Sequence, residues 1–250
     1  MNGSIASHVA RGIGRFVTAQ PGRVSYPGGA VSFSFADFPR SALEAGGAIL
    51  EKHHVRGTYY VALGLAGTLG PQGPIADRDQ ILEAHQRGHE IACHTYSHLD
   101  CSRATVPLIR DELRRNAEGL AELLNGFPLR NFAYPYGRYL LPVKRLVAPL
   151  FASSRGTCGG SNQGDVDFAD LRGTRIYAPQ YNESALKRLI DRNAEIGGWL
   201  IFYTHDVGDM PSAYGCTQDQ LETVVAHAVT RSPVLPVDEV IGALATRHAA

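Results

Sequence analysis

Two histidines four residues apart and one aspartate carry the clearest chemical signal in the sequence. His94 and His98 enclose the segment HTYSH, and Asp37 follows an apolar, β-prone run that ends at Phe35. Positions i and i+4 of a helical turn share one face, so these two imidazoles could hold one divalent ion, and Asp37 would add an oxygen ligand. Such a site leaves positions open for water and substrate, and its metal would activate a bound water and polarise a carbonyl.

Two further segments place chemically capable groups beside apolar runs. In FAYPYG, Pro135 should end a strand and leave the backbone N–H of Tyr136 free to stabilise an oxyanion. In FYTHD, an apolar run leads into His205, which could protonate a leaving amine. Each segment also has a structural explanation. The pair His94 and His98 could be a chance pair on a surface turn, FAYPYG an ordinary strand-to-loop turn, and His205 a hydrogen-bonded structural histidine.

The sequence pattern predicts alternating strands and helices. Strands are expected over residues 30–35, 57–63, 89–94, 131–136, 174–178, 199–205 and 234–237. Helices are expected over residues 41–53, 77–88, 108–126, 143–151, 182–198, 217–232 and 238–248. Repeated βα units favour a parallel sheet with helices outside it, either a barrel or a doubly wound sheet.

The candidate residues occupy equivalent places in this pattern. Asp37, His94, Tyr136 and His205 each fall at the C-terminal end of a different predicted strand. In a βα barrel those ends meet on the face that carries the active site. The pattern therefore predicts that the four residues converge.

Composition restricts the class of protein. The chain has 250 residues, 44% hydrophobic and 19% charged, which suits one domain over residues 1–250. Basic and acidic residues number 24 each, so we expect no nucleic acid or anionic membrane as partner. The four cysteines are scattered, and the N-terminus shows neither a signal peptide nor a membrane span. These features favour a cytoplasmic protein, with a removed leader as the alternative; they do not indicate an oligomeric state.

The order of the segments resembles that of the polysaccharide deacetylases, the NodB-like carbohydrate esterases of family 4. SFADF resembles their first motif, Thr/Ser-Phe-Asp-Asp, and HTYSH their His-Ser/Thr-x-x-His motif. AYPYG and IFYTH resemble the third and last motifs, so the match spans residues 31 to 206. The resemblance implies a single-domain distorted (β/α) barrel, similar to a TIM barrel. It also implies a divalent metal, usually zinc with cobalt or nickel as alternatives, held by Asp37, His94 and His98.

The resemblance implies roles for the remaining residues. His205 would be the general acid, the Tyr136 backbone N–H would bind the oxyanion, and Pro135 with Tyr136 would contact the substrate. The reaction would hydrolyse N-acetyl groups of an oligo- or polysaccharide that contains N-acetylglucosamine, releasing acetate. Ala36 stands where the family has its general base. Loss of a general base lowers the rate roughly 10² to 10⁴-fold, so we expect strongly reduced activity.

Other departures from the family pattern accompany Ala36. The third motif commonly has Arg where this chain has Ala133, and Arg155 is a candidate to fill that space. Candidates for the fourth-motif acid are Asp165, Asp167 and Asp170. An engineered Asp→Ala substitution and a natural pseudoenzyme both explain Ala36, and the intact metal ligands favour the engineered substitution.

The substrate and the rival functions complete the set of expectations. DFPRSA with GTYYV resembles members from bacterial exopolysaccharide and adhesin clusters, including holdfast polysaccharide deacetylases. This resemblance predicts action on a biofilm exopolysaccharide or its oligosaccharide precursor. A non-haem iron oxygenase also uses two histidines and one carboxylate, but the alternating β and α pattern disfavours it. A non-catalytic glycan-binding pseudoenzyme is the other alternative.

Overall fold

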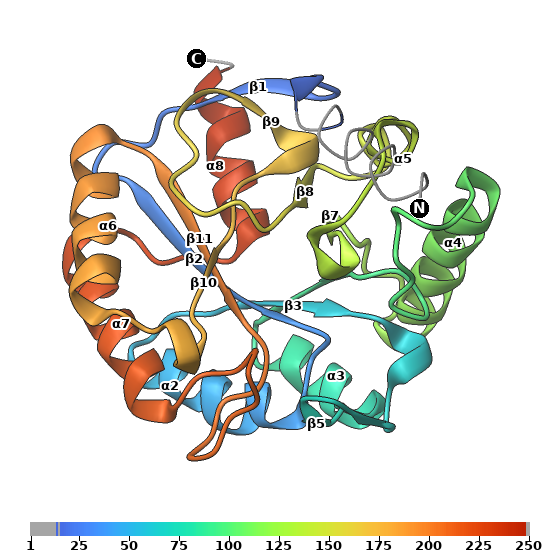
Figure 1. Ribbon diagram of the computed structural model, residues 1–250, viewed down its shortest axis with the longest axis horizontal. Coiled ribbons are helices and arrows are strands. Elements are labelled where there is room, and N and C mark those ends of the chain that lie inside the picture. Colours follow the sequence, from blue (N-terminus) through green and yellow to red (C-terminus); the bar gives the residue numbers. More distant parts are fainter. Residues whose placement is uncertain (1–13, 15, 249–250) are drawn as a thin grey trace, which may run out of the picture.

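The structure is a computed structural model that describes residue 14 and residues 16–248. Its centre is a curled sheet of seven parallel strands in the order β10-β11-β2-β3-β6-β7-β8 (Figure 1). The strands are β2 (Ala30–Ala36), β3 (Thr58–Val61), β6 (Glu90–Cys93), β7 (Asn131–Ala133), β8 (Ser153–Arg155), β10 (Thr174–Arg175) and β11 (Trp199–Thr204). The predicted barrel-like α/β fold is confirmed.

Helices surround the outer face of this sheet (Figure 1). They are α2 (Ala48–Lys52), α3 (Arg78–Gln86), α4 (Val106–Leu123), α5 (Leu141–Val147), α6 (Glu183–Ile196), α7 (Gln218–Arg231) and α8 (Val237–His248). The first part of the predicted helix at 41–53 is a π-helical segment, η1 (Ala42–Gly47). It packs so closely on β2 that a Cβ atom at Gly46 would lie 2.8 Å from the Phe35 ring.

The alternation of side chains along β2 fixes which residues face the barrel interior. Phe33 and Phe35 belong to the large apolar core between sheet and helices. Successive side chains of a strand point to opposite faces, so Ser34 and Ala36 face the interior. The same alternation directs Tyr60 of β3 inward, since its neighbour Tyr59 belongs to the outer core.

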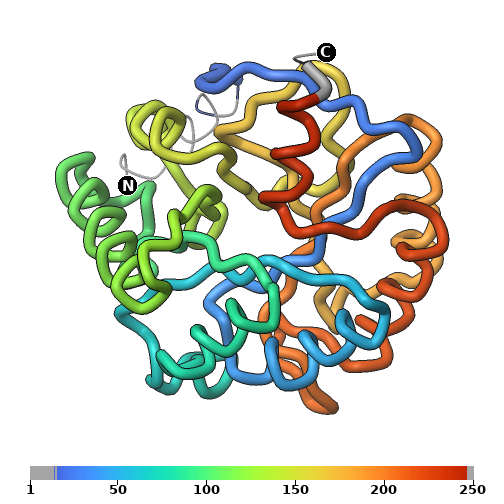
Figure 2. Tube along the Cα trace, turned by 180° about the vertical axis from the view of Figure 1, so that it is seen from behind, coloured from blue at the N-terminus to red at the C-terminus, as the bar shows by residue number. Residues whose placement is uncertain are grey.

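The barrel is open between its edge strands, β8 and β10, and shorter elements fill the gap. An isolated bridge joins Arg155 to Leu171. The strands β1 (Pro21–Val24) and β9 (Gly164–Asp167) form a separate antiparallel pair. Seen from behind, α8 lies in the upper part of the molecule, and its C-terminal end lies next to the chain segment that carries β1 (Figure 2).

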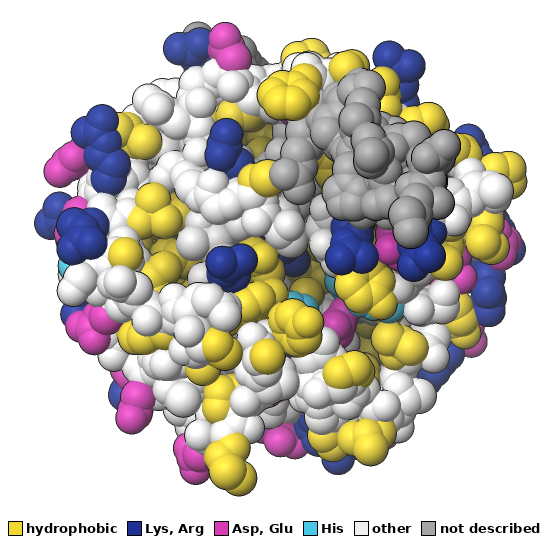
Figure 3. Space-filling model, in the orientation of Figure 1, with side chains coloured by type: hydrophobic (Ala, Val, Ile, Leu, Met, Phe, Trp, Pro, Cys, Tyr) yellow, Lys and Arg dark blue, Asp and Glu magenta, His cyan; other side chains and the backbone are white. Residues whose placement is uncertain are grey.

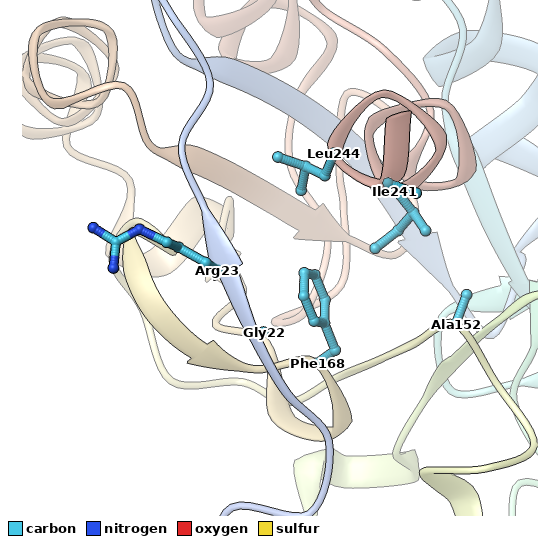
Figure 4. A pocket seen from close by; sticks show the side chains of 7 residues that line it. Gly22, Arg23, Ala152, Phe168, Ile241 and Leu244 are labelled. Atoms are coloured by element: carbon cyan, nitrogen blue, oxygen red, sulfur yellow. The ribbon is translucent and has the colours of Figure 1, made fainter. Parts of the chain in front are cut away.

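A small apolar cavity lies among β1, α8 and the turn η4 (Phe168–Asp170) (Figure 4). Its volume is about 190 Å³, and Ala152, Phe168, Ile241 and Leu244 contribute to its lining. Ala152 immediately precedes β8, so the cavity lies away from the carboxyl ends of the strands, where the candidate residues gather.

The main differences from the sequence expectations concern short strands. The predicted strand 131–136 ends at Ala133, and Tyr136 lies in a 3-10 turn, η3 (Pro135–Gly137). The strands β1, β8 and β9 were not expected. The segment 234–237 supplies one bridge, from Val234 to Val31, rather than a strand. Across the described residues, no helix has the length and apolar character of a membrane span.

Candidate metal centre

Asp37 is placed by a sharp turn at the end of β2. Asp37 and Phe38 both adopt left-handed backbone conformations, with φ of 62° and 53°. The Asp37 carboxylate is buried, and its Oδ1 atom lies 3.0 Å from His98 Nε2 and 3.4 Å from His94 Nε2. One ligand atom from each of the three residues lies within 4.8 Å of the other two. The predicted convergence of these residues is therefore present.

His94 is oriented by the neighbouring strand. It follows β6, and its Nδ1 atom lies 2.7 Å from the carbonyl oxygen of Ala133. A carbonyl can only accept, so Nδ1 carries the proton of the neutral ring and Nε2 presents a lone pair. That lone pair faces Asp37 Oδ1, a buried oxygen with no hydrogen-bond partner among the described residues. Two electron-rich atoms in this arrangement call for a cation between them.

The loop that carries His98 is not the helical turn suggested by its spacing. Thr95 and His98 have φ values of 61° and 58°, so the segment from His94 to His98 is irregular. The buried carboxylate of Glu112, on α4, accepts hydrogen bonds from the backbone N–H groups of Tyr96 and Ser97. This anchor folds the loop back, so the two imidazoles approach each other to 4.9 Å between ring centroids.

The electrostatics of the cluster suit a divalent ion. Burial alone would raise the pKa of Asp37, but the close approach of His94 and the positive charges that His94, His98 and His205 carry when protonated outweigh it and hold that pKa well below its usual range. Burial, with help from His94, lowers the pKa of His98 to about 4, so its ring is neutral at pH 7. One carboxylate oxygen and two imidazole nitrogens form a donor set that fits zinc, cobalt or nickel.

His205 stands on the opposite side of the carboxylate. It follows β11, and its Nε2 atom lies 3.8 Å from Asp37 Oδ2. Its Nδ1 atom lies 3.1 Å from the carbonyl oxygen of Tyr214, which leaves Nε2 directed toward the site. Burial lowers the pKa of His205. Among the described residues, Asp37 is the only carboxylate within ion-pair distance of this ring.

Tyr136 borders the same site. Its backbone is left-handed, with φ of 58°, and its N–H has no hydrogen-bond acceptor among the residues described. Its half-exposed ring lies 4.5 Å from the His98 ring, centroid to centroid. Figure 3 shows histidine and acidic side chains together in a hollow near the centre of this face, bordered by hydrophobic side chains.

The interior wall beside Ala36 has a different character. Ala36 pairs in register with Tyr60, and the Tyr60 ring packs against Ala92 and Ala133. Arg155 comes from β8, where it pairs with Ala133, and its guanidinium lies 4.9 Å from the centre of the Tyr60 ring. The space left by Ala133 is thus filled by a tyrosine ring, and the nearest arginine comes from the adjacent strand.

The candidate fourth-motif aspartates all have partners elsewhere. Asp165 pairs with Arg23, Asp167 with the buried Lys144, and Asp170 accepts from the Tyr139 hydroxyl. The sequence analysis did not predict that Tyr60 lines the barrel interior beside Ala36 or that Glu112 anchors the loop of His98. The alternation within GTYYVAL could have directed Tyr60 inward, whereas no local signal marked Glu112.

Fold and site together define a barrel-like α/β protein with a candidate metal centre at the carboxyl ends of its strands. The sequence model of the polysaccharide deacetylases matches residues 23–150, so the chain belongs to the polysaccharide deacetylase family. No curated protein matches the chain in a sequence search.

Three solved structures share the fold. A putative polysaccharide deacetylase from Mycobacterium smegmatis is 16% identical, covers 93% of this chain and 96% of its own, and has a TM-score of 0.61. The chitin deacetylase of the fungal pathogen Colletotrichum lindemuthianum is 16% identical with a TM-score of 0.61, covering 88% of this chain and 90% of its own. A mutant of a family 4 pseudoenzyme, with restored enzymatic activity, is 15% identical and has a TM-score of 0.54. The match covers 89% of this chain and 70% of the pseudoenzyme chain.

Proposed function

We propose that the chain binds a divalent metal ion, zinc in the first place, through Asp37, His94 and His98, and that it is a polysaccharide N-deacetylase with strongly reduced activity. The convergence of one carboxylate oxygen and two imidazole nitrogens carries this proposal. The substrate class is an exopolysaccharide, or its oligosaccharide precursor, that contains N-acetylhexosamine. Deacetylation would release acetate from each hydrolysed amide.

The other residues of the site would act on the substrate directly. When bound, the metal supplies Lewis-acid polarisation and an acidified water. The Tyr136 N–H has no acceptor among the described residues and would donate to the developing oxyanion. His205, whose Nδ1–H donates to the Tyr214 carbonyl, would first take up a proton from solvent at Nε2 and then pass that proton to the leaving amine. Pro135, which precedes Tyr136 in the same turn, is buried and would fix the floor of the substrate site.

The weak step is proton removal from water. Ala36 presents a methyl group at the position of the family's general base, and a methyl group accepts no proton. A non-catalytic glycan-binding pseudoenzyme is the second candidate function, and Ala133 favours it. One engineered substitution would explain Ala36 but not Ala133. Because the interior wall departs from the family pattern at both positions, a natural pseudoenzyme is the simpler explanation of the pair.

The test compares acetate release from N-acetylglucosamine oligomers, with added zinc, by the chain as it stands, Ala36→Asp and Ala36→Asn. The asparagine variant has nearly the same shape but accepts no proton. We expect Ala36→Asp to gain roughly 100-fold or more and Ala36→Asn to gain nothing. Zinc binding with no activity in any of the three proteins would count against the deacetylase proposal and favour glycan binding.

The cellular setting is a separate proposal. Resemblance to members from exopolysaccharide and holdfast clusters supports a cytoplasmic role in biofilm polymer synthesis. Deletion of the gene should then leave more N-acetyl groups and fewer free amines on that polymer. An unchanged amine content would contradict this setting while leaving the site chemistry untouched.

A further inference from the structure

Arg155 is a buried cation with no carboxylate partner among the residues described here. Its side chain is 3% exposed, and its Nε atom has no hydrogen-bond partner. Within the described part of the chain, its Nη1 atom donates a hydrogen bond to the carbonyl oxygen of the next residue, Gly156. A buried charge is ordinarily paired with an opposite charge. Among the described residues, no carboxylate lies within ion-pair distance to neutralise this guanidinium, which makes it a candidate for binding an anion.

Two tyrosines fix where this cation lies. Its Cζ atom is 4.9 Å from the ring centre of Tyr60, on β3, and 4.6 Å from that of Tyr203, on β11. In the sheet, β2 lies between β11 and β3. A group that contacts inward-facing rings on both neighbours lies over the inner face of β2, where Ser34 and Ala36 point inward. Tyr203 pairs in register with Ser34, and Tyr60 pairs with Ala36.

A second polar group lies in the same place. The Tyr60 hydroxyl is buried, and the Arg155 guanidinium beside it is the one group among the described residues placed to interact with it. A guanidinium N–H and a phenol O–H are both donors, and they match the two oxygens of a carboxylate. Ala36, which pairs in register with Tyr60, carries only a methyl group on this inner face, where a longer acidic side chain would place a carboxylate.

We propose that Arg155 and Tyr60 form a binding slot for a small carboxylate anion, of the formate and acetate class, against the methyl group of Ala36. The link to catalysis rests on the proposed function, in which acetate is the product. A bound carboxylate would then stand where the family carries its general base. The slot itself can be tested without a glycan and without a metal.

The experiment measures thermal unfolding of the full chain against sodium formate, with sodium chloride as reference and a chelator present so that formate cannot bind a metal. We expect the unfolding temperature to rise by about 3 °C at tenfold the dissociation constant and to rise further with the logarithm of the formate concentration. Arg155→Lys, which keeps the charge and loses the planar fork, should weaken formate binding at least about tenfold. Tyr60→Phe removes only the hydroxyl and should weaken it roughly threefold to tenfold.

Two controls complete the design. Ala36→Asp fills the slot with its own carboxylate and should abolish the formate effect. Arg114→Met removes an arginine exposed on α4 and should leave the effect intact. A formate response equal to that of chloride, or one retained in both Arg155→Lys and Tyr60→Phe, would overturn the slot. Formate binding without acetate release from glycans would instead count against the proposed function.

Discussion

The two sides of the barrel mouth differ in how completely their polar groups are supported. On the metal side, both histidine ligands have a second contact that orients them: the Ala133 carbonyl holds His94, and Glu112 anchors the loop of His98. On the wall beside Ala36, methyl groups and a tyrosine ring occupy the interior, and Arg155 lacks a counter-ion among the described residues. The comparison separates metal binding from proton removal. Under the proposed function, Asp37, His94 and His98 would serve metal binding, while Ala36 offers no group for proton removal.

The largest expected effect comes from removing a metal ligand. His94→Ala should weaken zinc binding by more than about 100-fold. Removing only the hydrogen-bond partner of a metal ligand lowers metal affinity roughly 10 to 100-fold, and removing the ligand itself should cost more. His227→Ala is the matched control, since His227 lies on α7 and bonds Asp191 far along the chain from the site. Competition with a chromophoric chelator measures both affinities. Equal zinc affinity in the two variants would show that the metal side is not a metal site.

The next largest effect is expected from Glu112, which anchors the loop that carries His98. Glu112 is buried and accepts from two backbone N–H groups and the Ser97 hydroxyl. Glu112→Gln weakens these charge-assisted bonds, so we expect a loss of about 1–3 kcal/mol in unfolding free energy and roughly tenfold in zinc affinity. Glu118→Gln, exposed on the same helix, should change neither. A loss of stability with unchanged zinc affinity would show that Glu112 supports the fold without positioning His98.

The same contrast explains what the sequence could and could not predict. The strand ends that carry Asp37, His94 and His205 follow clear apolar runs, so local pattern sufficed to predict their convergence. The spacing of His94 and His98 predicts a helical turn. In the structure the two imidazoles are instead brought together by an irregular loop, which two left-handed residues bend and which donates hydrogen bonds to Glu112. A buried carboxylate that acts on a loop 15 residues away leaves no local signature.

The wall beside Ala36 was less predictable for a related reason. Ser153–Arg155 forms a strand that contains no large apolar residue, so no hydrophobic period revealed β8. Without β8, the inward position of Arg155 could not be derived, although the residue itself was a candidate. The pairing of Arg155 with Ala133 is a property of sheet order, which strand propensity does not determine.

A buried carboxylate at the opposite end of β6 tests whether this barrel generally tolerates unpaired charge. Burial raises the pKa of Glu90 to about 7, against hydrogen bonds from Asn131, the Asp238 N–H and Thr58. Because the folded pKa exceeds the unfolded one, the stabilisation is complete below about pH 4 and is lost as the pH rises through 7.

Relative to Glu90→Gln, which does not titrate, the unfolding free energy of the parent chain should therefore fall by about 2 kcal/mol between pH 5 and pH 8. Denaturant titrations of both proteins at several pH values measure this difference. A constant difference across that range would mean that Glu90 is ionised in the fold, and that the three donors suffice to hold a buried charge.

The smallest effect expected is the coupling between position 36 and Arg155, and it bears most directly on the comparison. An aspartate at position 36 would lie on the inner face of β2, over which the Arg155 guanidinium lies between Tyr60 and Tyr203. In a double-mutant cycle of Ala36→Asp and Arg155→Met, the aspartate should destabilise the fold by about 1 kcal/mol more when the arginine is absent. Ala36→Asn in the same cycle should show no such coupling, because it carries no charge. Chemical denaturation at pH 8, where the aspartate is ionised, gives all four free energies. Additive effects would place the guanidinium out of reach of position 36, and the cation would then be held by its two tyrosine rings alone.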